Sequence, residues 1–160
     1  MSLDSILLLT TEFPPQPGGI GNHAFHLAKG LQKHGRSVTV ICDARSKAGK
    51  EEAIFDANLD FKVIRISRKR LLLRTFIKRI QTAFIQNKKN KTVLASGKFS
   101  LWLAAFLSLF FNRQYVAIIH GKEVQLSNSI LKYFTDRSLK RFDTVIAVSR
   151  YTKSLVARLE

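Results

Sequence analysis

Residues 5–42 read SILLLTTEFPPQPGGIGNHAFHLAKGLQKHGRSVTVIC, and this stretch decides the fold class. Ser5–Thr10 is a short, continuous apolar run, which is typical of a strand covered on both faces. Asn22–His34 places apolar residues at helical spacing, and Ser37–Cys42 is rich in β-branched residues, as strands are. A strand, a helix and a second strand in this order predict a βαβ unit with parallel strands.

The same alternation continues to the end of the chain. Further strands are expected at Phe61–Ile66, Thr92–Ala95, Tyr115–Ile119 and Thr144–Val148, and further helices at Lys69–Gln86, Phe99–Phe111, Ser129–Arg141 and Tyr151–Leu159. Arg45–Asn58 is polar and is expected to be a loop. The pattern predicts an α/β fold, a Rossmann-like parallel sheet flanked by helices. A chain of 160 residues without an internal boundary or repeat fits one domain over residues 1–160.

The charge of the chain is large and localised. The formal net charge is +16 at pH 7, and residues 61–122 hold no aspartate or glutamate. Such a field attracts lipid headgroups, nucleic acids or phosphorylated substrates, although a generally basic globular protein would also carry it. Apolar residues make up 46% of the sequence, which excludes a disordered chain.

Cysteine content and hydropathy indicate the compartment. The single cysteine, Cys42, excludes an intramolecular disulfide framework, and its apolar neighbours predict a buried thiol in a reducing compartment. No secretory signal is visible, and the longest apolar stretch, Phe99–Phe111, is shorter than the roughly twenty residues that span a bilayer. We therefore expect a cytoplasmic protein, with a peripheral position at the inner face of the membrane as a further option.

The loop after the first strand carries glycines that suit a phosphate. In open parallel sheets, ligands bind at the carboxyl ends of the strands. Gly18 and Gly19 let the backbone approach a ligand, and Gly21 opens a helix whose first N–H groups have no internal partner, so this loop suits a phosphate. The alternative is a proline-rich turn whose glycines serve its geometry alone.

Gly19, Gly21 and Ala24 also match the spacing of a dinucleotide-binding fingerprint, with Asp43 near the distance expected for a ribose-binding acid. In that fold, however, the first glycine closely follows the strand in a tight turn. Here a proline-rich segment separates Thr10 from Gly19. Binding of NAD is therefore not expected.

Three stretches of the sequence carry motifs that occur in a set order along the chain. FPPQPGGIG at 13–21 precedes the helix HLAKGLQKHG at 26–35 and the strand SVTVI at 37–41. IHG at 119–121 closes a later strand, and DTVIAVSRYTK at 143–153 contains the last strand and the start of the last helix. In this order they resemble the N-terminal lobe of a retaining glycosyltransferase of the GT-B fold, of the group 1 or family 4 type, over the whole chain. The resemblance implies that donor phosphate or acceptor binds at Gly18, Gly19 and Gly21, and that Glu12 either meets an acceptor hydroxyl or is simply solvated.

The resemblance implies that His120 contacts the donor sugar, and His120 is our candidate catalytic residue. It follows the strand Tyr115–Ile119, where an imidazole can hydrogen-bond a sugar hydroxyl or stabilise developing charge, or only cap the strand. Gly121 and Ser149 also follow strands and are expected at the rim of the cleft. His23 and His26 lie one turn apart, but no cysteine or carboxylate near them completes a ligand set, so no metal is expected.

In the resembled family, a C-terminal lobe holds the nucleotide and diphosphate through a basic pair and a spaced pair of glutamates. Glu51 and Glu52 are adjacent and do not match that pair. The resemblance therefore implies that this lobe works with its own C-terminal domain, supplies the acceptor side of the cleft and is inactive alone. It also implies a nucleotide-diphosphate sugar as donor substrate, no tightly bound cofactor and no metal.

Lys69–Gln86 predicts a basic amphipathic helix. Its apolar face is expected to carry Leu73, Phe76, Ile77, Ile80, Ala83 and Phe84. The cations in and before it are expected to form a basic patch for an acceptor or a membrane: Arg68, Lys69, Arg70, Arg74, Lys78 and Arg79. An ordinary helix packed on the sheet by its apolar face fits equally well. Nucleic acid is not expected as a partner, because Phe76 and Phe84 fall on the apolar stripe and so are not free to stack on bases.

The expected function is transfer of a sugar, of the hexosyltransferase type, from a nucleotide-diphosphate sugar to a saccharide or lipid-linked acceptor. Bacterial cell-envelope polysaccharide synthesis is the expected setting. The competing function is a standalone basic α/β module that binds anions or membranes without catalysis.

Overall fold

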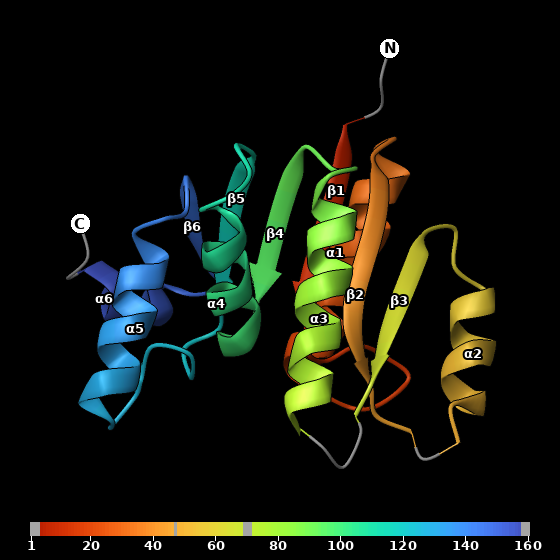
Figure 1. The fold of residues 1–160 in the computed structure, drawn as a ribbon, viewed down its shortest axis with the longest axis horizontal. Coiled ribbons are helices and arrows are strands. Elements are labelled where there is room, and N and C mark those ends of the chain that lie inside the picture. The colour runs from red at the N-terminus through yellow and green to blue at the C-terminus, as the bar shows by residue number, and fades with distance from the viewer. Residues whose placement is uncertain (1–3, 47, 69–71, 158–160) are drawn as a thin grey trace.

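The structure is a computed structural model that describes residues 4–46, 48–68 and 72–157, with only the backbone of Leu72. Six parallel strands form one sheet in the order β3-β2-β1-β4-β5-β6 (Figure 1). They are β1 (Ser5–Thr10), β2 (Ser37–Ala44), β3 (Lys62–Ser67), β4 (Thr92–Ser96), β5 (Gln114–Ile119) and β6 (Thr144–Ala147). The predicted α/β class and parallel sheet are confirmed.

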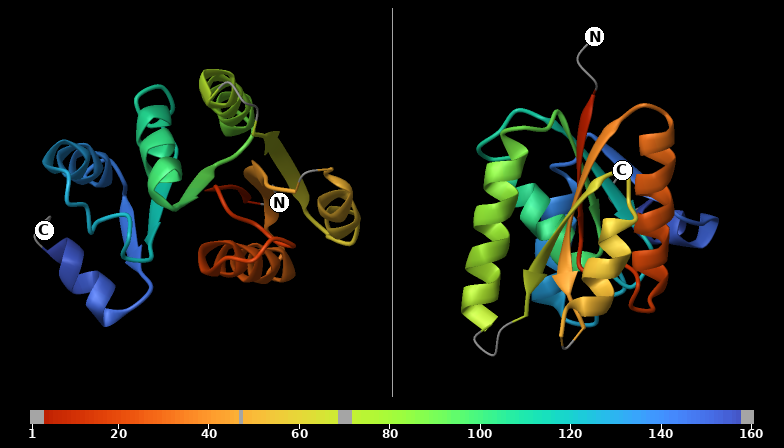
Figure 2. Two further views of the ribbon diagram at one scale, coloured as in Figure 1. Left: turned by 90° about the horizontal axis from the view of Figure 1, so that it is seen from below. Right: turned by 90° about the vertical axis from the view of Figure 1, so that its right-hand side faces the viewer.

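Helices cover both faces of the sheet. Helices α3 (Leu72–Asn87), α4 (Lys98–Leu107) and α5 (Ser129–Leu139) lie on one face, whereas α1 (Gly19–Lys33) and α6 (Arg150–Val156) lie on the other (Figure 2). None of the helices in the described ranges is long and apolar enough to cross a bilayer. The residues at 69–71 and 158–159, which the sequence also assigns to helices, lie outside the described ranges.

The expectation that Arg45–Asn58 is a loop is wrong, because this segment contains helix α2 (Lys50–Ala57). Its Phe55 packs against Phe13 and Phe25, with ring centroids 6.5 and 5.5 Å apart. The helix is short, and its other large apolar residue, Ile54, is 67% exposed. Phe55 and the ion pairs of Glu52 and Asp56 with Arg65 hold it in place, and these contacts leave no apolar periodicity in the sequence.

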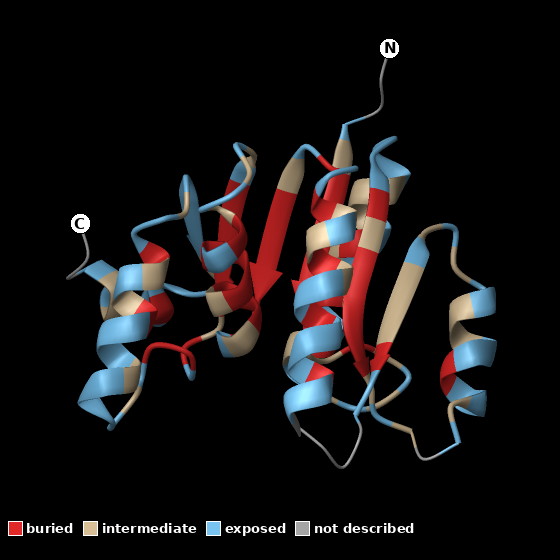
Figure 3. Ribbon diagram, in the orientation of Figure 1, coloured by how far each residue is buried: buried red, intermediate tan, exposed pale blue. Residues whose placement is uncertain are grey.

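Alternate residues of the central strands supply two apolar cores. Leu7 and Leu9 belong to the core beneath α3, α4 and α5, and Ile6 and Leu8 belong to the core beneath α1. The middle strands are buried along most of their length (Figure 3). This two-sided burial explains why the first strand reads as a continuous apolar run.

Helix α3 packs on the sheet by only the last part of its expected apolar stripe, where Ala83 is buried and Phe84 packs against the core. Leu73 and Ile77 of the stripe are 68% and 45% exposed. The residues that face the sheet recur every fourth position, and most of them are polar: Thr75, Arg79, Ala83 and Asn87. The helix therefore presents much of its apolar stripe to solvent.

Buried polar partners explain this orientation of α3. Arg79 donates from Nε to Asp43 Oδ1 at 2.9 Å, and its second nitrogen also bonds the Asp43 carboxylate. Further along the helix, the Asn87 amide donates to the Tyr115 hydroxyl at 3.1 Å. Asp43 is only 2% exposed, and a buried carboxylate without a partner is costly. Turning the helix to bury its stripe would break these contacts.

Candidate functional site

The carboxyl ends of β1, β4 and β5 lie side by side and carry the central group of the candidate site. Thr10 pairs in register with Ser96, and Ser96 pairs with Ile118. His120 follows β5 and is half-buried, with its Nε2 2.9 Å from the Ser96 hydroxyl oxygen. His120 is therefore neither sealed in the core nor remote from the loop after β1.

The imidazole of His120 also meets the first part of helix α1. The ring of His23 stands edge-on to that of His120, with centroids 5.0 Å apart. On the other side, the His120 amide donates to Glu123 Oε2 at 3.2 Å. Glu123 is buried, and its Oε1 has no hydrogen-bond partner among the described residues. Ser96, His23 and Glu123 were not predicted as site residues, although the position of Ser96 at a strand end was a usable signal.

Burial lowers the pKa of His120 below its ordinary value of 6.5. The Glu123 carboxylate opposes this shift, the neighbouring His23 adds to it, and Glu12 opposes it weakly. The imidazole is therefore uncharged at neutral pH and offers one N–H donor and one acceptor. Such a group suits a sugar hydroxyl better than it suits a fixed negative charge.

Helix α1 begins at Gly19, earlier than the predicted Asn22, so Gly19 and Gly21 both lie in its first turn. A Cβ on Gly21 would stand 2.9 Å from the Glu12 carbonyl carbon and from the Phe13 nitrogen. These are backbone atoms that cannot easily move aside. Gly21 is thus required by the close approach of the loop to its own helix.

Glu12 lies over Gly18, the residue that precedes α1. Its Oε2 would be 2.3 Å from a Cβ on Gly18, and Nη1 of Arg45 would be 3.6 Å from the same point. A carboxylate at the amino end of a helix is favoured by the helix dipole. Because the carboxylate already occupies this position, an entering phosphate would be repelled unless Glu12 turned away, whereas an acceptor hydroxyl could donate to it.

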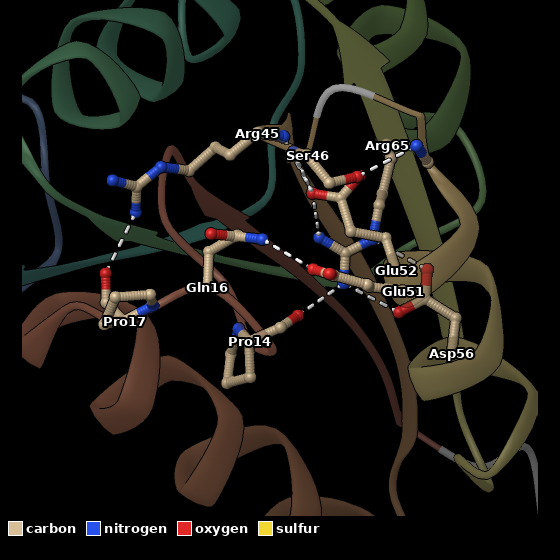
Figure 4. Close-up of polar contacts among 10 residues, drawn as sticks. Pro14, Gln16, Pro17, Arg45, Ser46, Glu51, Glu52, Asp56 and Arg65 are labelled. Atoms are coloured by element: carbon tan, nitrogen blue, oxygen red, sulfur yellow. Dashed lines mark hydrogen bonds and ion pairs between the residues drawn. The ribbon is translucent and has the colours of Figure 1, made fainter.

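Side chains from β3, from α2 and from the residue that follows β2 hold the proline-rich loop in place (Figure 4). Arg65 donates to the Pro14 carbonyl at 2.5 Å, and Arg45 donates to the Pro17 carbonyl at 3.3 Å. Gln16 donates to Glu51 at 3.1 Å. The loop is therefore held at Pro14, Gln16 and Pro17, directly before the glycines.

Arg65 is itself fixed by two acids of α2. It bonds Asp56 through Nε and Nη2, each at 2.8 Å, and Glu52 Oε1 at 3.3 Å. Burial raises the pKa of Glu52, but hydrogen bonds from the Arg45 amide and from Ser46, with Arg65 nearby, hold it below its ordinary value. The sequence interpretation missed this network. The usable signal was an arginine inside the apolar strand KVIRIS.

A shallow cavity of about 360 Å³ lies against this anchored loop. Pro14, Pro17, Gly18 and Asn22 contribute to its lining. The exposed Gly19 also lines it, which places the start of α1 at the cavity wall. A ligand that contacts the glycine loop would enter here.

Gly121 and Ser149 both serve the loops at the sheet edge. Gly121 has a φ of 118°, which favours glycine, and a Cβ there would lie 3.7 Å from the Thr152 hydroxyl oxygen. The Ser149 hydroxyl accepts from the Thr152 amide at 3.0 Å and so caps helix α6. Ser149 also lines a cavity of about 640 Å³ beside β6, together with Phe142 and Val145.

The expected basic patch is only partly formed. Arg74 and Lys78 are exposed on α3, and the exposed Arg68 reaches the Asp43 carboxylate at 3.3 Å. Arg79 is buried against Asp43, so its assignment to the surface patch is wrong. Lys69 and Arg70 lie outside the described residues.

Two other ligand types were considered at this edge. Asp43 lies in β2, as a ribose-binding acid would, but its carboxylate is bonded to Arg79 and Arg68 and is not free for a ribose. Within residues 4–46, 48–68 and 72–157, no group of three or more histidine, cysteine, aspartate or glutamate side chains is placed to hold a metal ion.

Solved structures with the same fold include several that bind or are named for sugar nucleotides. HepE from Anabaena, in complex with UDP-glucose, has a TM-score of 0.70 at 19% identity, covering 97% of this chain and 40% of HepE. A putative UDP-N-acetylglucosamine 2-epimerase from Listeria monocytogenes has a TM-score of 0.64 at 14% identity, covering 99% of this chain and 43% of the other. MurG from Acinetobacter baumannii has a TM-score of 0.63 at 13% identity, covering 91% and 42%. At these identities the likeness shows the fold alone, and this chain spans less than half the length of each.

The sequence match is more specific than the structural likeness. No curated protein matches the sequence. The model of Glycosyltransferase Family 4, however, matches residues 17–160, which is most of the chain. Together with the described fold, this match confirms the resemblance to the N-terminal lobe of the GT-B fold, and the chain belongs to glycosyltransferase family 4.

Proposed function

We propose that this lobe forms the acceptor side of a retaining transferase that moves a hexosyl group from a nucleotide-diphosphate sugar to a saccharide or lipid-linked acceptor. A C-terminal domain would hold the nucleotide, and the lobe alone would be inactive. The proposed setting is polysaccharide synthesis for a bacterial cell envelope, at the cytoplasmic face of the membrane. The binding of UDP-glucose by HepE, which has the same fold, supports a nucleotide sugar as donor.

One observation carries this proposal. The imidazole of His120 contacts both the Ser96 hydroxyl and the ring of His23, and His23 is in the helix that the glycine loop opens. Residues from three separate strand–loop connections thus converge at the carboxyl edge of the sheet, where parallel α/β proteins bind ligands.

The chain's own groups have distinct roles in this proposal. Neutral His120 would hydrogen-bond a hydroxyl of the donor sugar and stabilise charge that develops near the reacting carbon, with Ser96 orienting the ring. Glu12 would accept a hydrogen bond from the acceptor hydroxyl at the start of α1. The anchored loop 14–18 would form the wall of the acceptor cavity.

The test uses the protein that contains this lobe followed by its C-terminal domain, with UDP-glucose as the first donor probe. His120→Ala should lower kcat by about a hundredfold, because it removes a group that acts on developing charge. His34→Ala is the matched control, since His34 is exposed at the far end of α1. Equal activity of the two variants would overturn the role of His120.

A binding experiment tests the division between the lobes. UDP should bind the two-lobed protein and bind this chain alone only weakly. Titration calorimetry of both proteins with UDP and GDP would measure this. Tight binding of either nucleotide by the isolated lobe would contradict the proposed arrangement.

A further inference from the structure

Glu123 is a buried acid beside the candidate site to which the proposed mechanism gives no role. It lies in the turn after β5 and is only 2% exposed. Its Oε2 accepts a hydrogen bond from the His120 amide at 3.2 Å, whereas its buried Oε1 has no hydrogen-bond partner among the described residues. Burying a carboxyl group in this way costs free energy, because water satisfies both oxygens in the unfolded chain. Packing alone does not account for such a residue.

The turn that carries Glu123 is closely bonded. The amides of Val124 and Gln125 both donate to the Gly121 carbonyl, at 3.0 and 3.1 Å. Val124 itself is buried in the core beneath α3, α4 and α5. These contacts fix the backbone on both sides of Glu123, and its side chain turns back to the amide of His120. A single turn therefore holds the two residues together.

Other caps in this chain are neutral and exposed. Asn128 at the start of α5 accepts from two backbone amides at 3.0 Å, and Ser149 at the start of α6 accepts from one at 3.0 Å. Both residues are exposed, so water can satisfy whatever the backbone does not. Glu123 makes the same kind of bond with an ionisable group in a buried place. A cap alone would not require either property.

The ring of His120 is surrounded by groups from four segments of the chain. Ser96 at the end of β4 and His23 of α1 contact it directly, and Glu12 and Glu123 act on it through their charges. Burial has the largest effect and lowers the pKa of His120, and the Glu123 carboxylate opposes it. The effects of His23, which lowers this pKa, and of Glu12, which raises it, are smaller than that of Glu123. Glu123 is thus the charged group with the strongest influence on the ring.

We infer that Glu123 is a positioning residue of the proposed transfer reaction, which holds the backbone of His120 and strengthens its ring as a hydrogen-bond acceptor. The inference rests on the proposed function, because it takes His120 to contact the donor sugar. Glu123 is too buried to touch a substrate, so it acts through His120 alone. A negative charge near an imidazole makes the ring more basic, and a more basic ring accepts a hydrogen bond from a sugar hydroxyl more strongly.

An NMR titration of the imidazole in the 160-residue chain tests this coupling without any measurement of activity. Glu123→Gln keeps an oxygen that can accept from the His120 amide but removes the charge, so the pKa of His120 should fall. Asp60→Asn is the control, because Asp60 is exposed before β3, at the opposite end of the strands. It should leave this pKa unchanged. An unchanged pKa in Glu123→Gln as well would overturn the inference.

Kinetics of the two-lobed protein with UDP-glucose test the role in transfer. Glu123→Gln should lower kcat about tenfold, less than His120→Ala does, because the ring stays in place. In the His120→Ala background, Glu123→Gln should cause no further loss, since the group through which it acts is gone. A tenfold loss in both backgrounds would show that Glu123 acts independently of His120 and would contradict the inference.

Glu123→Asp separates charge from packing. It keeps the charge and removes one methylene group, so the pKa of His120 and kcat should both lie closer to the parent values than in Glu123→Gln. If the two variants behaved alike, a disturbed turn would explain the losses, and the role assigned to the charge would be wrong.

The same measurements distinguish this inference from the proposed function. If His120→Ala left kcat at the parent value, both would fail together. If His120→Ala lowered kcat and Glu123→Gln did not, only the role of Glu123 would fail.

Discussion

Helices α1 and α3 are both amphipathic, yet they pack on the sheet in different ways. Helix α1 buries small residues, Gly21, Ala24 and Ala28, and half-buries the larger Phe25 and Leu31 beside them. Helix α3 buries Arg79 and Asn87 and leaves Leu73 exposed. An apolar stripe therefore shows that a helix is amphipathic, but a buried polar partner on the sheet can decide which side faces inward.

The difference begins at two adjacent residues of β2. Cys42 points into the apolar core beneath α1, and Asp43 points to the opposite face, where it bonds Arg79 of α3. Because successive residues of a strand face opposite ways, one strand imposes an apolar contact on one helix and an ionic contact on the other.

The largest expected effect comes from the ionic contact of α3. Arg79→Ala should destabilise the protein by about 3 kcal/mol, because among the described residues it leaves the buried Asp43 with the exposed Arg68 as its one charged partner. Urea unfolding measures the change. Lys78→Ala, on the exposed side of the same helix, should stay within about 0.5 kcal/mol of the parent. If the two variants lost the same small amount of unfolding free energy, Asp43 and Arg79 would not determine how α3 packs.

Two glycines of α1 test how tightly that helix packs at its start and near its end. Gly21→Ala should cost about 1–3 kcal/mol, since its Cβ would press on the backbone of Glu12 and Phe13. Gly30→Ala should instead stabilise the protein by about 0.5–1 kcal/mol, because a Cβ at Gly30 meets no atom within 4 Å. Thermal unfolding of the two variants provides the measurement. Opposite signs are expected, and equal shifts would show that the start of α1 is not tightly packed.

A smaller effect should appear in the pH dependence of stability. Burial lowers the pKa of His120 in the folded state, so the unfolded chain binds more protons and stability should fall as the pH drops below about 6.5. In His120→Asn this part of the decline should disappear, while stability near pH 8 changes less. The measurement is the unfolding free energy of both proteins at constant salt between about pH 5 and 8, a range that includes the ordinary pKa of histidine. An identical slope in both would show that His120 does not cause the decline.

The smallest expected effect is in the rate at which Cys42 reacts with a thiol reagent. Burial raises the pKa of its thiol to about 12, with Arg65 opposing and nearby acids adding to the shift. The native protein should therefore react with a thiol reagent only when it opens, and the rate should rise with added urea. Rapid labelling of the folded protein would mean that the core beneath α1 is less closed than the packing of Phe13 and Val40 indicates.

Much of the fold could be predicted from the sequence because it depends on local patterns. All six strands overlap their expected ranges, since two-sided burial gives runs such as SILLLT, and the more exposed β6 is still rich in β-branched residues. Helix α2 was missed because it is short and is held by one apolar side chain, Phe55, and by polar contacts of Glu52 and Asp56 with Arg65, which give no apolar pattern. The orientation of α3 stayed open between two alternatives because the Arg79–Asp43 contact joins residues far apart in the chain, and no pattern within the helix records it.

The candidate site was predictable to a similar extent. His120 and the glycine loop could be found because ligands of parallel sheets bind where strands end. Ser96 occupies such a position, but its bond to His120 depends on the strand order, which places β4 beside β5. The anchoring of the loop by Arg65 could not be predicted, because it requires knowing that β3 lies at the edge next to β2.

The anchored loop has a consequence for ligand affinity. A flexible loop loses conformational entropy when it closes on a ligand, and that loss is subtracted from the binding free energy. In this lobe, Arg65 and Arg45 already hold the Pro14 and Pro17 carbonyls before any ligand arrives. The ordering of this wall is therefore part of folding, and a saccharide entering the cavity would bind a preorganised surface.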